Sequence, residues 1–197
     1  MSGAKTSVFK KELNWIKDSN IRDFVSQQLE KLPDYFFEVA ASSTGKYHPS
    51  YALGEGGLVR HTKAAVAIAK DLLGIEMYDR RYTQQEKDII LAAVILHDGM
   101  KHGTSGSNYT VATHPTEMAE FIRVDADDML GTEVADVLCG AIASHMGQWN
   151  TDYKTKKEIL PKPHTAIQMF VHQCDYLASR KYLEVNFDAI NYEGNRV

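Results

Sequence analysis

The sequence has no long hydrophobic run, few cysteines and no excess of basic residues. None of its apolar stretches reaches the roughly 18 residues that cross a bilayer, and the lysines near the start precede no apolar stretch, so we expect neither a membrane span nor a secretory signal. The 22 Lys and Arg residues stand against 26 Asp and Glu residues, and the formal net charge of −4 disfavours a general coat for long nucleic acids. The two cysteines, Cys139 and Cys174, fit reduced thiols in a cytoplasmic protein better than a disulfide framework.

The composition is that of an ordinary globular protein. Of the 197 residues, 44% are hydrophobic and 24% are charged, which is enough for one substantial core. We find no internal repeat, low-complexity tract or linker that would divide the chain. The eight histidines are many for a chain of this length, and they direct attention to metal binding or catalysis.

Apolar residues recur with helical spacing over most of the chain, so the sequence predicts an all-α fold. The expected helices cover residues 8–15, 21–32, 34–40, 57–74, 83–97, 115–124, 132–145 and 163–182. Loops are expected at 41–57, 99–106 and 147–161. The first of these loops collects Ser, Thr, Gly, Pro and His, a composition typical of a functional loop.

Ionisable side chains occupy positions on the inner faces of several expected helices. The segment 88–97 is apolar on nearly all sides, which is typical of a helix at the centre of a bundle. The inward positions are held by His61, by the pair His97–Asp98 at the end of that central helix, by His145 and by Asp175. Each of them continues an apolar stripe of its own helix or ends the central helix.

Burying one such group without a partner costs a few kcal/mol, so the set must either satisfy itself or bind something. Imidazoles and carboxylates without cysteine match the preferences of a divalent transition metal such as Mn, Fe, Co, Ni or Zn. Any one of these histidines alone is better explained as a hydrogen-bonded core or surface residue. The joint pattern on four helices is what favours a metal site.

These residues give the sequence a resemblance to a known family, the HD-domain metal-dependent phosphohydrolases. That family carries a histidine, then a His–Asp doublet at the end of a core helix, then a distant aspartate, which read here as His61, His97–Asp98 and Asp175. The motif GGLVRHT at 56–62, preceded by a segment with Lys46 and His48, is similar to the entry to the HD domain of bacterial 3′–5′ exoribonucleases. Lys101 completes an HDxxK form, and His114 and His145 match the extra ligands of the two-metal branch of the family.

The resemblance covers residues 40–181 and implies a division of the chain. Residues 1–40 are then a short helical N-terminal extension, 41–182 a single HD phosphohydrolase domain built as a helical bundle, and 183–197 a C-terminal tail. Two departures matter. The first 40 residues cannot supply the OB-fold that precedes the HD domain in the exoribonucleases, which argues against a polynucleotide substrate, and the Gly-Tyr-Pro motif of the cyclic-dinucleotide branch is absent.

The resemblance also implies a role for each site residue. One metal is expected at His61, His97, Asp98 and Asp175, and a second at Asp98, His114 and His145, with Asp98 as the bridge. Lys101 is expected to neutralise charge on the phosphoryl oxygens, its alternative being an exposed loop lysine. Further phosphates would contact Arg60, Lys46 and His48.

We therefore expect a hydrolase that cleaves a phosphomonoester or phosphodiester of a nucleotide or short oligonucleotide by a metal-bound hydroxide. The alternatives are a 3′–5′ exonuclease acting on RNA or single-stranded DNA, a non-catalytic nucleotide-binding module, and a mononuclear form of the enzyme. The expected partners are a divalent transition metal, in two copies, and a small phosphorylated substrate. The sequence fixes neither the exact substrate nor the native metal, the oligomeric state, the tail's role or the roles of His102, His164 and His172.

Overall fold

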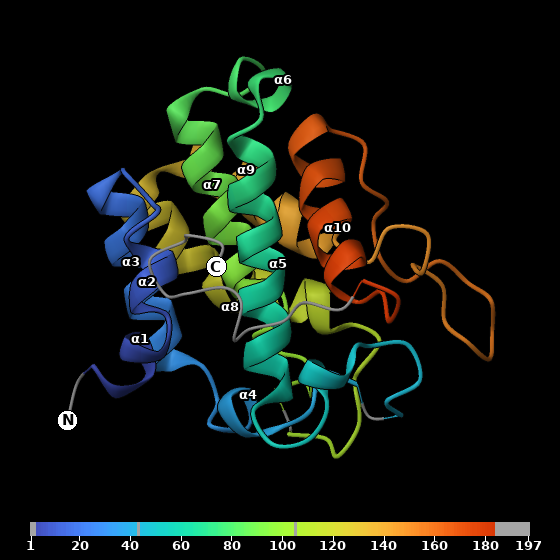
Figure 1. Ribbon diagram of the computed structural model, residues 1–197. Helices are drawn as coiled ribbons and strands as arrows, with labels where there is room; N and C mark the ends of the chain where they lie inside the picture. The colour runs from blue at the N-terminus through green and yellow to red at the C-terminus, as the bar shows by residue number, and fades with distance from the viewer. Residues whose placement is uncertain (1–2, 43, 105, 184–197) are drawn as a thin grey trace.

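The computed structural model describes residues 3–42, 44–104 and 106–183. This part of the chain is helical, with a single isolated bridge between Thr151 and Glu158 and no strand, so the predicted all-α class is confirmed (Figure 1). The helices are α1 (Ala4–Val8), α2 (Lys10–Leu13), α3 (Ser19–Lys31), α4 (Tyr35–Glu38), the 3-10 turn η1 (Ser50–Ala52), α5 (Gly57–Leu73), α6 (Glu76–Asp79), α7 (Gln84–Leu96), α8 (His114–Leu130), α9 (Thr132–Ala143) and α10 (Ala166–Ala178).

Helix α7 lies at the centre of the bundle. Its sequence from Asp88 to Leu96 is buried without a break, because it is apolar on nearly every side. It packs against α3, α5, α9 and α10, and α8 covers α9 (Figure 1). A capping box between Thr83 and Glu86 begins the helix, so the start of α7 is fixed and its far end delivers His97 and Asp98 to the interior.

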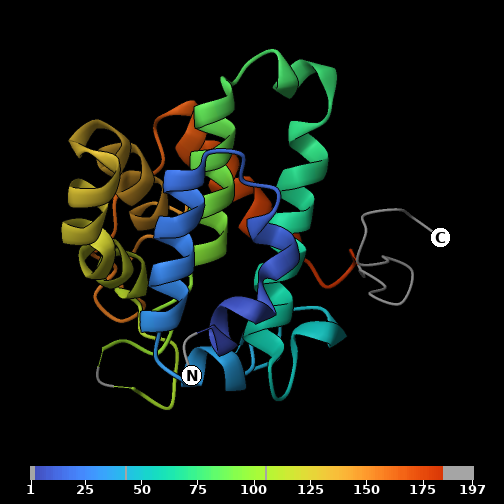
Figure 2. The same ribbon diagram turned by 90° about the vertical axis from the view of Figure 1, so that its left-hand side faces the viewer.

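The residues before position 41 share the core of the rest of the chain. Phe9, Phe24 and Leu29 are fully buried, and α3 packs against both α7 and α8 (Figure 2). The buried carboxylate of Asp88 in α7 accepts hydrogen bonds from the backbone N–H groups of Lys17 and Asp18. The N-terminal helices are thus an integral part of one packed core.

Helix boundaries differ from the expected ones where local chemistry decides them. The segment 8–15 is divided between α1 and α2 at Phe9, and α8 continues six residues beyond 124, to Leu130, where Gly131 with a φ of 82° ends it. Helix α10 starts three residues later than expected, at Ala166, because the capping box of Thr165 and Gln168 fixes its start, and it ends at Ala178, four residues before 182. The short elements η1 and α6 were not expected from the sequence.

Among the described residues, no helix combines the length and the apolar content that crossing a membrane needs.

Candidate metal centre

Five helices bring the six expected ligands together at one buried place. They are His61 in α5, His97 and Asp98 at the end of α7, His114 at the start of α8, His145 just after α9 and Asp175 in α10. The side chains of all four histidines and of Asp98 are at most 1% exposed, and that of Asp175 is 17% exposed. The predicted grouping of these residues is therefore present in the structure.

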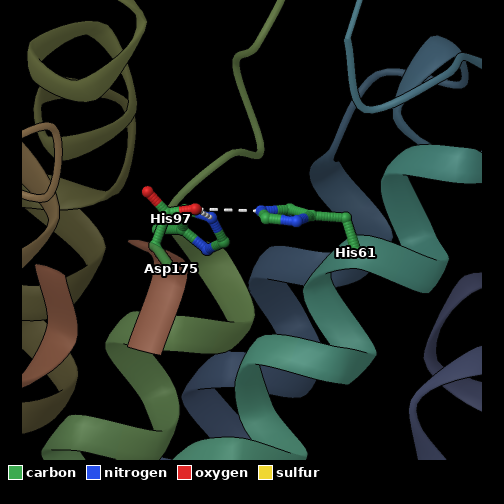
Figure 3. A group of neighbouring side chains, drawn as sticks. All are labelled: His61, His97 and Asp175. Atoms are coloured by element: carbon green, nitrogen blue, oxygen red, sulfur yellow. Dashed lines mark hydrogen bonds and ion pairs between the residues drawn. The ribbon is translucent and has the colours of Figure 1, made fainter. Parts of the chain in front are cut away.

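His61, His97 and Asp175 form the first part of the centre (Figure 3). The Nε2 atom of His61 lies 2.9 Å from Oδ1 of Asp175, and Nε2 of His97 lies 3.5 Å from the same oxygen. Ligand atoms of these three residues all lie within 4.8 Å of one another, a separation that one metal ion can span. Three helices far apart in the sequence thus contribute to a single group of donors.

Asp98 separates this group from a second pair of histidines. Its Oδ2 atom lies 3.4 Å from Nε2 of His97 and 3.8 Å from Nε2 of His61. Its Oδ1 atom lies 3.0 Å from Nε2 of His114 and 3.5 Å from Nε2 of His145. Each carboxylate oxygen therefore faces one pair of imidazoles, which is the arrangement that a carboxylate bridging two metal ions needs.

Backbone carbonyls fix the ring orientation of three of the histidines. Nδ1 of His97, of His114 and of His145 each lies 2.7 Å from the carbonyl oxygen three residues earlier, at Val94, Val111 and Ile142. A carbonyl oxygen only accepts, so Nδ1 donates and carries the proton. The lone pair of a neutral ring is then at Nε2, which points into the centre as a metal-ligating nitrogen does.

Among the described residues, three buried imidazole nitrogens make no hydrogen bond, namely Nδ1 of His48, Nδ1 of His61 and Nε2 of His97. Nε2 of His97 makes no hydrogen bond to any described residue, although it faces carboxylate oxygens of Asp98 and Asp175. A buried polar atom without a partner is costly, and a cation held between it and the carboxylates would remove that cost. The donor set of imidazole nitrogen and carboxylate oxygen, without thiolate, fits a divalent transition metal.

The charges of the centre favour a bound cation. Burial opposes ionisation of Asp98, but Lys101 and His97 hold the pKa of its carboxyl well below the usual value. Asp175 is likewise kept ionised by His61 and His97, which lower its pKa against the effect of burial. Burial lowers the pKa of His114 to about 4, so this imidazole is neutral and available as a ligand.

His97 has the opposite shift. Burial works to lower its pKa, but the negative charges of Asp98 and Asp175 outweigh burial and raise the pKa to about 10. A proton on His97 therefore balances the two carboxylates when no metal is bound. Metal binding would replace this proton, so the centre exchanges one positive charge for another.

Lys101 is buried beside Asp98. Its side chain is 10% exposed, and Nζ lies 3.0 Å from Oδ1 and 2.7 Å from Oδ2 of Asp98. The alternative of an exposed loop lysine is therefore wrong. The loop after α7 turns back so that the ammonium group reaches the carboxylate three residues earlier.

The three expected phosphate contacts lie in different surroundings. The Arg60 side chain donates from Nε to the carbonyl of Tyr51 and from Nη2 to that of Leu53, which holds the loop before α5 in place. Lys46 is exposed at the surface of this loop. His48 lies over His61 with ring centroids 5.0 Å apart, and burial, followed by the charges of His61 and Lys101, lowers its pKa to about 3. Only His48 is thus placed against the metal-site residues, and the phosphate roles of all three stay predictions.

The three remaining histidines, His102, His164 and His172, lie in different surroundings. His102 is buried and stacks on Tyr35, with ring centroids 5.2 Å apart, and His164 is exposed. His172 donates from Nδ1 to the carbonyl of His145 at 2.7 Å, so it supports the backbone that presents a ligand. Sequence reasoning gave His172 no certain role, since the acceptor is a backbone carbonyl 27 residues away.

Comparison with protein-family models, with curated proteins and with solved structures finds no match to this chain. The likeness to HD-domain phosphohydrolases therefore stays a prediction from the residues quoted above. Function is therefore inferred from the positions of the candidate ligands in this structure.

Proposed function

We propose that the protein is a metal-dependent phosphohydrolase of the HD type that acts on a phosphate ester of a nucleotide or short oligonucleotide. The observation that carries the proposal is the position of Asp98, whose two oxygens face two different pairs of imidazoles. A structural metal needs one closed set of ligands, whereas paired sites that share a carboxylate are typical of hydrolytic centres.

The residues divide naturally between two metal positions. His61, His97, Asp98 and Asp175 would hold one divalent ion, and Asp98, His114 and His145 would hold the other. Ligand atoms of His97, Asp98 and His145 also lie within 4.8 Å of one another, so His97 lies beside both positions. Bound divalent ions supply Lewis acidity toward a phosphoryl group and lower the pKa of water. The second set has fewer protein donors than the first, which leaves coordination positions for substrate.

Side chains beside the ligands would act on the substrate directly. Lys101 pairs with Asp98 in this structure. Cations bound at the centre would compete with it for Asp98, and its ammonium group would then neutralise negative charge that develops on the phosphoryl oxygens. His48 is neutral and lies over His61, so it can donate a hydrogen bond to a phosphate oxygen without a change in charge. Lys101 is buried and His48 is partly buried, which limits the access of bulk water to the reacting group.

The proposal is tested with protein purified without a metal-affinity tag. Elemental analysis is expected to find up to two transition-metal ions per chain, and loading with Mn, Fe, Co, Ni or Zn is expected to give phosphate or nucleoside release from at least one member of a nucleotide and oligonucleotide panel. Asp98→Asn should abolish turnover, while Asp125→Asn, which removes a surface ion pair with Lys31, should not. No turnover with any metal and substrate, from protein that binds metal, would overturn the proposal.

A further inference from the structure

The candidate metal centre is least buried at Asp175, in α10. Five of its six ligand side chains are at most 1% exposed, and Asp175 alone, at 17%, reaches the surface. Asp175 is therefore the ligand nearest to solvent, and we expect substrate to enter on its side. Tyr176, the next residue of α10, belongs to a group of three interacting side chains.

This group, which we name the aromatic platform, consists of two aromatic rings and a guanidinium group, from Trp149, Tyr176 and Arg180. The rings of Trp149 and Tyr176 are stacked, with centroids 5.6 Å apart and planes inclined by 13°. The guanidinium carbon of Arg180 lies 4.2 Å from the centroid of Tyr176 and 5.7 Å from that of Trp149. Trp149 remains 46% exposed, so much of its surface is not used for packing.

The chain holds Trp149 in place from both sides. Before it, Gly147 passes so close to His172 that a Cβ atom would lie 2.2 Å from the imidazole, and its φ of 60° favours glycine. After it, the buried side chain of Asn150 donates to the carbonyl of Leu160, which closes the loop that follows. A rigid aromatic ring loses little entropy when a ligand binds, so the platform is pre-organised.

The platform is joined to the metal ligands through short covalent and hydrogen-bonded paths. Tyr176 follows Asp175 directly, and Trp149 lies four residues after His145. His172 lies between them, with its ring centroid 6.2 Å from that of Trp149 and its Nδ1 atom bonded to the carbonyl of His145. The same segments therefore position both the metal ligands and the platform.

We infer that the aromatic platform binds the nucleobase of the substrate by stacking, while the phosphate lies at the metal centre. Every base presents a π-face, so a stacking surface accepts nucleobases with little regard to sequence, and an arginine beside it adds a cation–π contact. The inference rests on the proposed function for the place of the phosphate, but base binding is measurable without turnover. It assigns a role to an exposed tryptophan that packing does not require.

Binding is tested by fluorescence of metal-free protein in EDTA. The chain has two tryptophans, so Trp15→Phe leaves Trp149 as the only one. Titration with AMP, GMP, CMP and UMP is expected to quench its emission to saturation, and ribose 5-phosphate is expected to leave it unchanged. Trp149→Phe in the otherwise unaltered chain should remove the response. Emission that none of the four nucleotides alters, or that ribose 5-phosphate alters equally, would overturn the inference.

Kinetics separate this inference from the proposed function. With metal-loaded protein, Trp149→Ala is expected to raise KM for a nucleoside monophosphate about five- to hundredfold, with ribose 5-phosphate hydrolysis unchanged. Trp149→Tyr should restore most of the affinity, and Tyr153→Ala, at an 86% exposed ring outside the platform, should have no effect. If substitution of Trp149 does not change turnover, base binding by the aromatic platform is contradicted and the proposed phosphohydrolase activity is unaffected. Saturable quenching without turnover of any substrate supports the platform and contradicts the phosphohydrolase.

Discussion

The ammonium group of Lys101 lies within 3.0 Å of both carboxylate oxygens of Asp98, the residue that separates the two histidine pairs. In metal-free protein this one cation therefore faces the same oxygens that two metal ions would share. The arrangement makes Lys101 and the metal ions alternative sources of positive charge for Asp98, and this exchange can be measured.

Lys101→Met is expected to destabilise the metal-free protein more than the metal-loaded protein. Removing the ammonium group leaves the buried carboxylate of Asp98 with less compensation, a loss on the order of 3 kcal/mol in the free energy of unfolding. Bound metal restores positive charge at Asp98, so the loss should shrink when Mn²⁺ is present. Urea unfolding in EDTA and in Mn²⁺, each compared with the unaltered protein, gives both values.

The matched control is Lys63→Met. Lys63 pairs with the largely buried Glu12 between α5 and α2, and neither residue is among the candidate ligands. Its loss of stability should be equal in EDTA and in Mn²⁺. If the Lys101 variant also lost the same amount in both conditions, the ammonium group and the metal would not share Asp98.

Metal stoichiometry should depend on the second histidine pair. His114 and His145 face Oδ1 of Asp98 with their Nε2 atoms 3.3 Å apart, so the double variant His114→Gln and His145→Gln removes two of the three donors at that position. We expect the ratio of metal to protein to fall from about two to about one by elemental analysis. His164→Gln, at an exposed histidine, should leave the ratio unchanged. An unaltered ratio in the double variant would favour the mononuclear form.

The thiol of Cys139 should resist modification at mildly alkaline pH. Burial, the largest influence, raises its pKa to about 11, and Cys174 is fully buried. A raised pKa keeps the thiol protonated at pH 8, and only the thiolate reacts with a disulfide reagent. Ellman's reagent is therefore expected to titrate no thiol in the native protein and both thiols in urea, where the pKa returns to about 8.5.

A control shows that the reagent itself is competent. Met77 is 65% exposed, so Met77→Cys adds a thiol that should react at once in native protein. Fast reaction of a native thiol in the unaltered chain would contradict the burial of Cys139 and Cys174. In the native protein, the slow reaction of Cys139 should become faster as the pH rises from 8 toward its pKa, since the thiolate fraction of Cys139 then increases.

Five of the six ligands, all but His114, could be predicted from the sequence pattern because helical spacing decides which residues face inward. His114 was expected only from the resemblance to the two-metal branch of the HD family. Asp175 follows the apolar stripe of α10, and His97 and Asp98 end a helix that is apolar on nearly every side, so their burial follows from periodicity. The same spacing predicted the helices themselves. Helical spacing did not predict where each helix begins or ends, because a glycine or a capping box decides the boundary. Gly131 ends α8, and the capping box of Thr165 starts α10.

Loops and side-chain reach explain what the sequence did not reveal. Lys101 lies in the loop after α7, and nothing in its neighbours indicates that the loop turns the ammonium group back onto Asp98. The stacking of Trp149 on Tyr176 joins residues 27 positions apart through a loop without periodicity. Arg60 donates to the carbonyl oxygens of Tyr51 and Leu53. Every residue has a backbone carbonyl, so the sequence does not indicate which of them accepts a hydrogen bond from a side chain.

Gly147→Ala is expected to be more destabilising than an ordinary substitution of a glycine with positive φ. The added Cβ atom would overlap the ring of His172, which would have to move and give up its hydrogen bond to the carbonyl of His145. Backbone strain alone costs about 1 kcal/mol, and the steric overlap with the lost hydrogen bond should bring the total to about 3 kcal/mol. Urea unfolding measures the loss.

Gly54→Ala separates the two contributions. Gly54 has a φ of 69°, and no atom lies within 4 Å of a Cβ added there, so its substitution should cost the strain alone. In the double variant Gly147→Ala and His172→Ala the overlap is gone. The loss in the free energy of unfolding of this variant should therefore be smaller than the sum of the losses of the two single variants. Equal losses for Gly54→Ala and Gly147→Ala, with no coupling to His172, would contradict the tight passage that holds Trp149 beside the metal ligands.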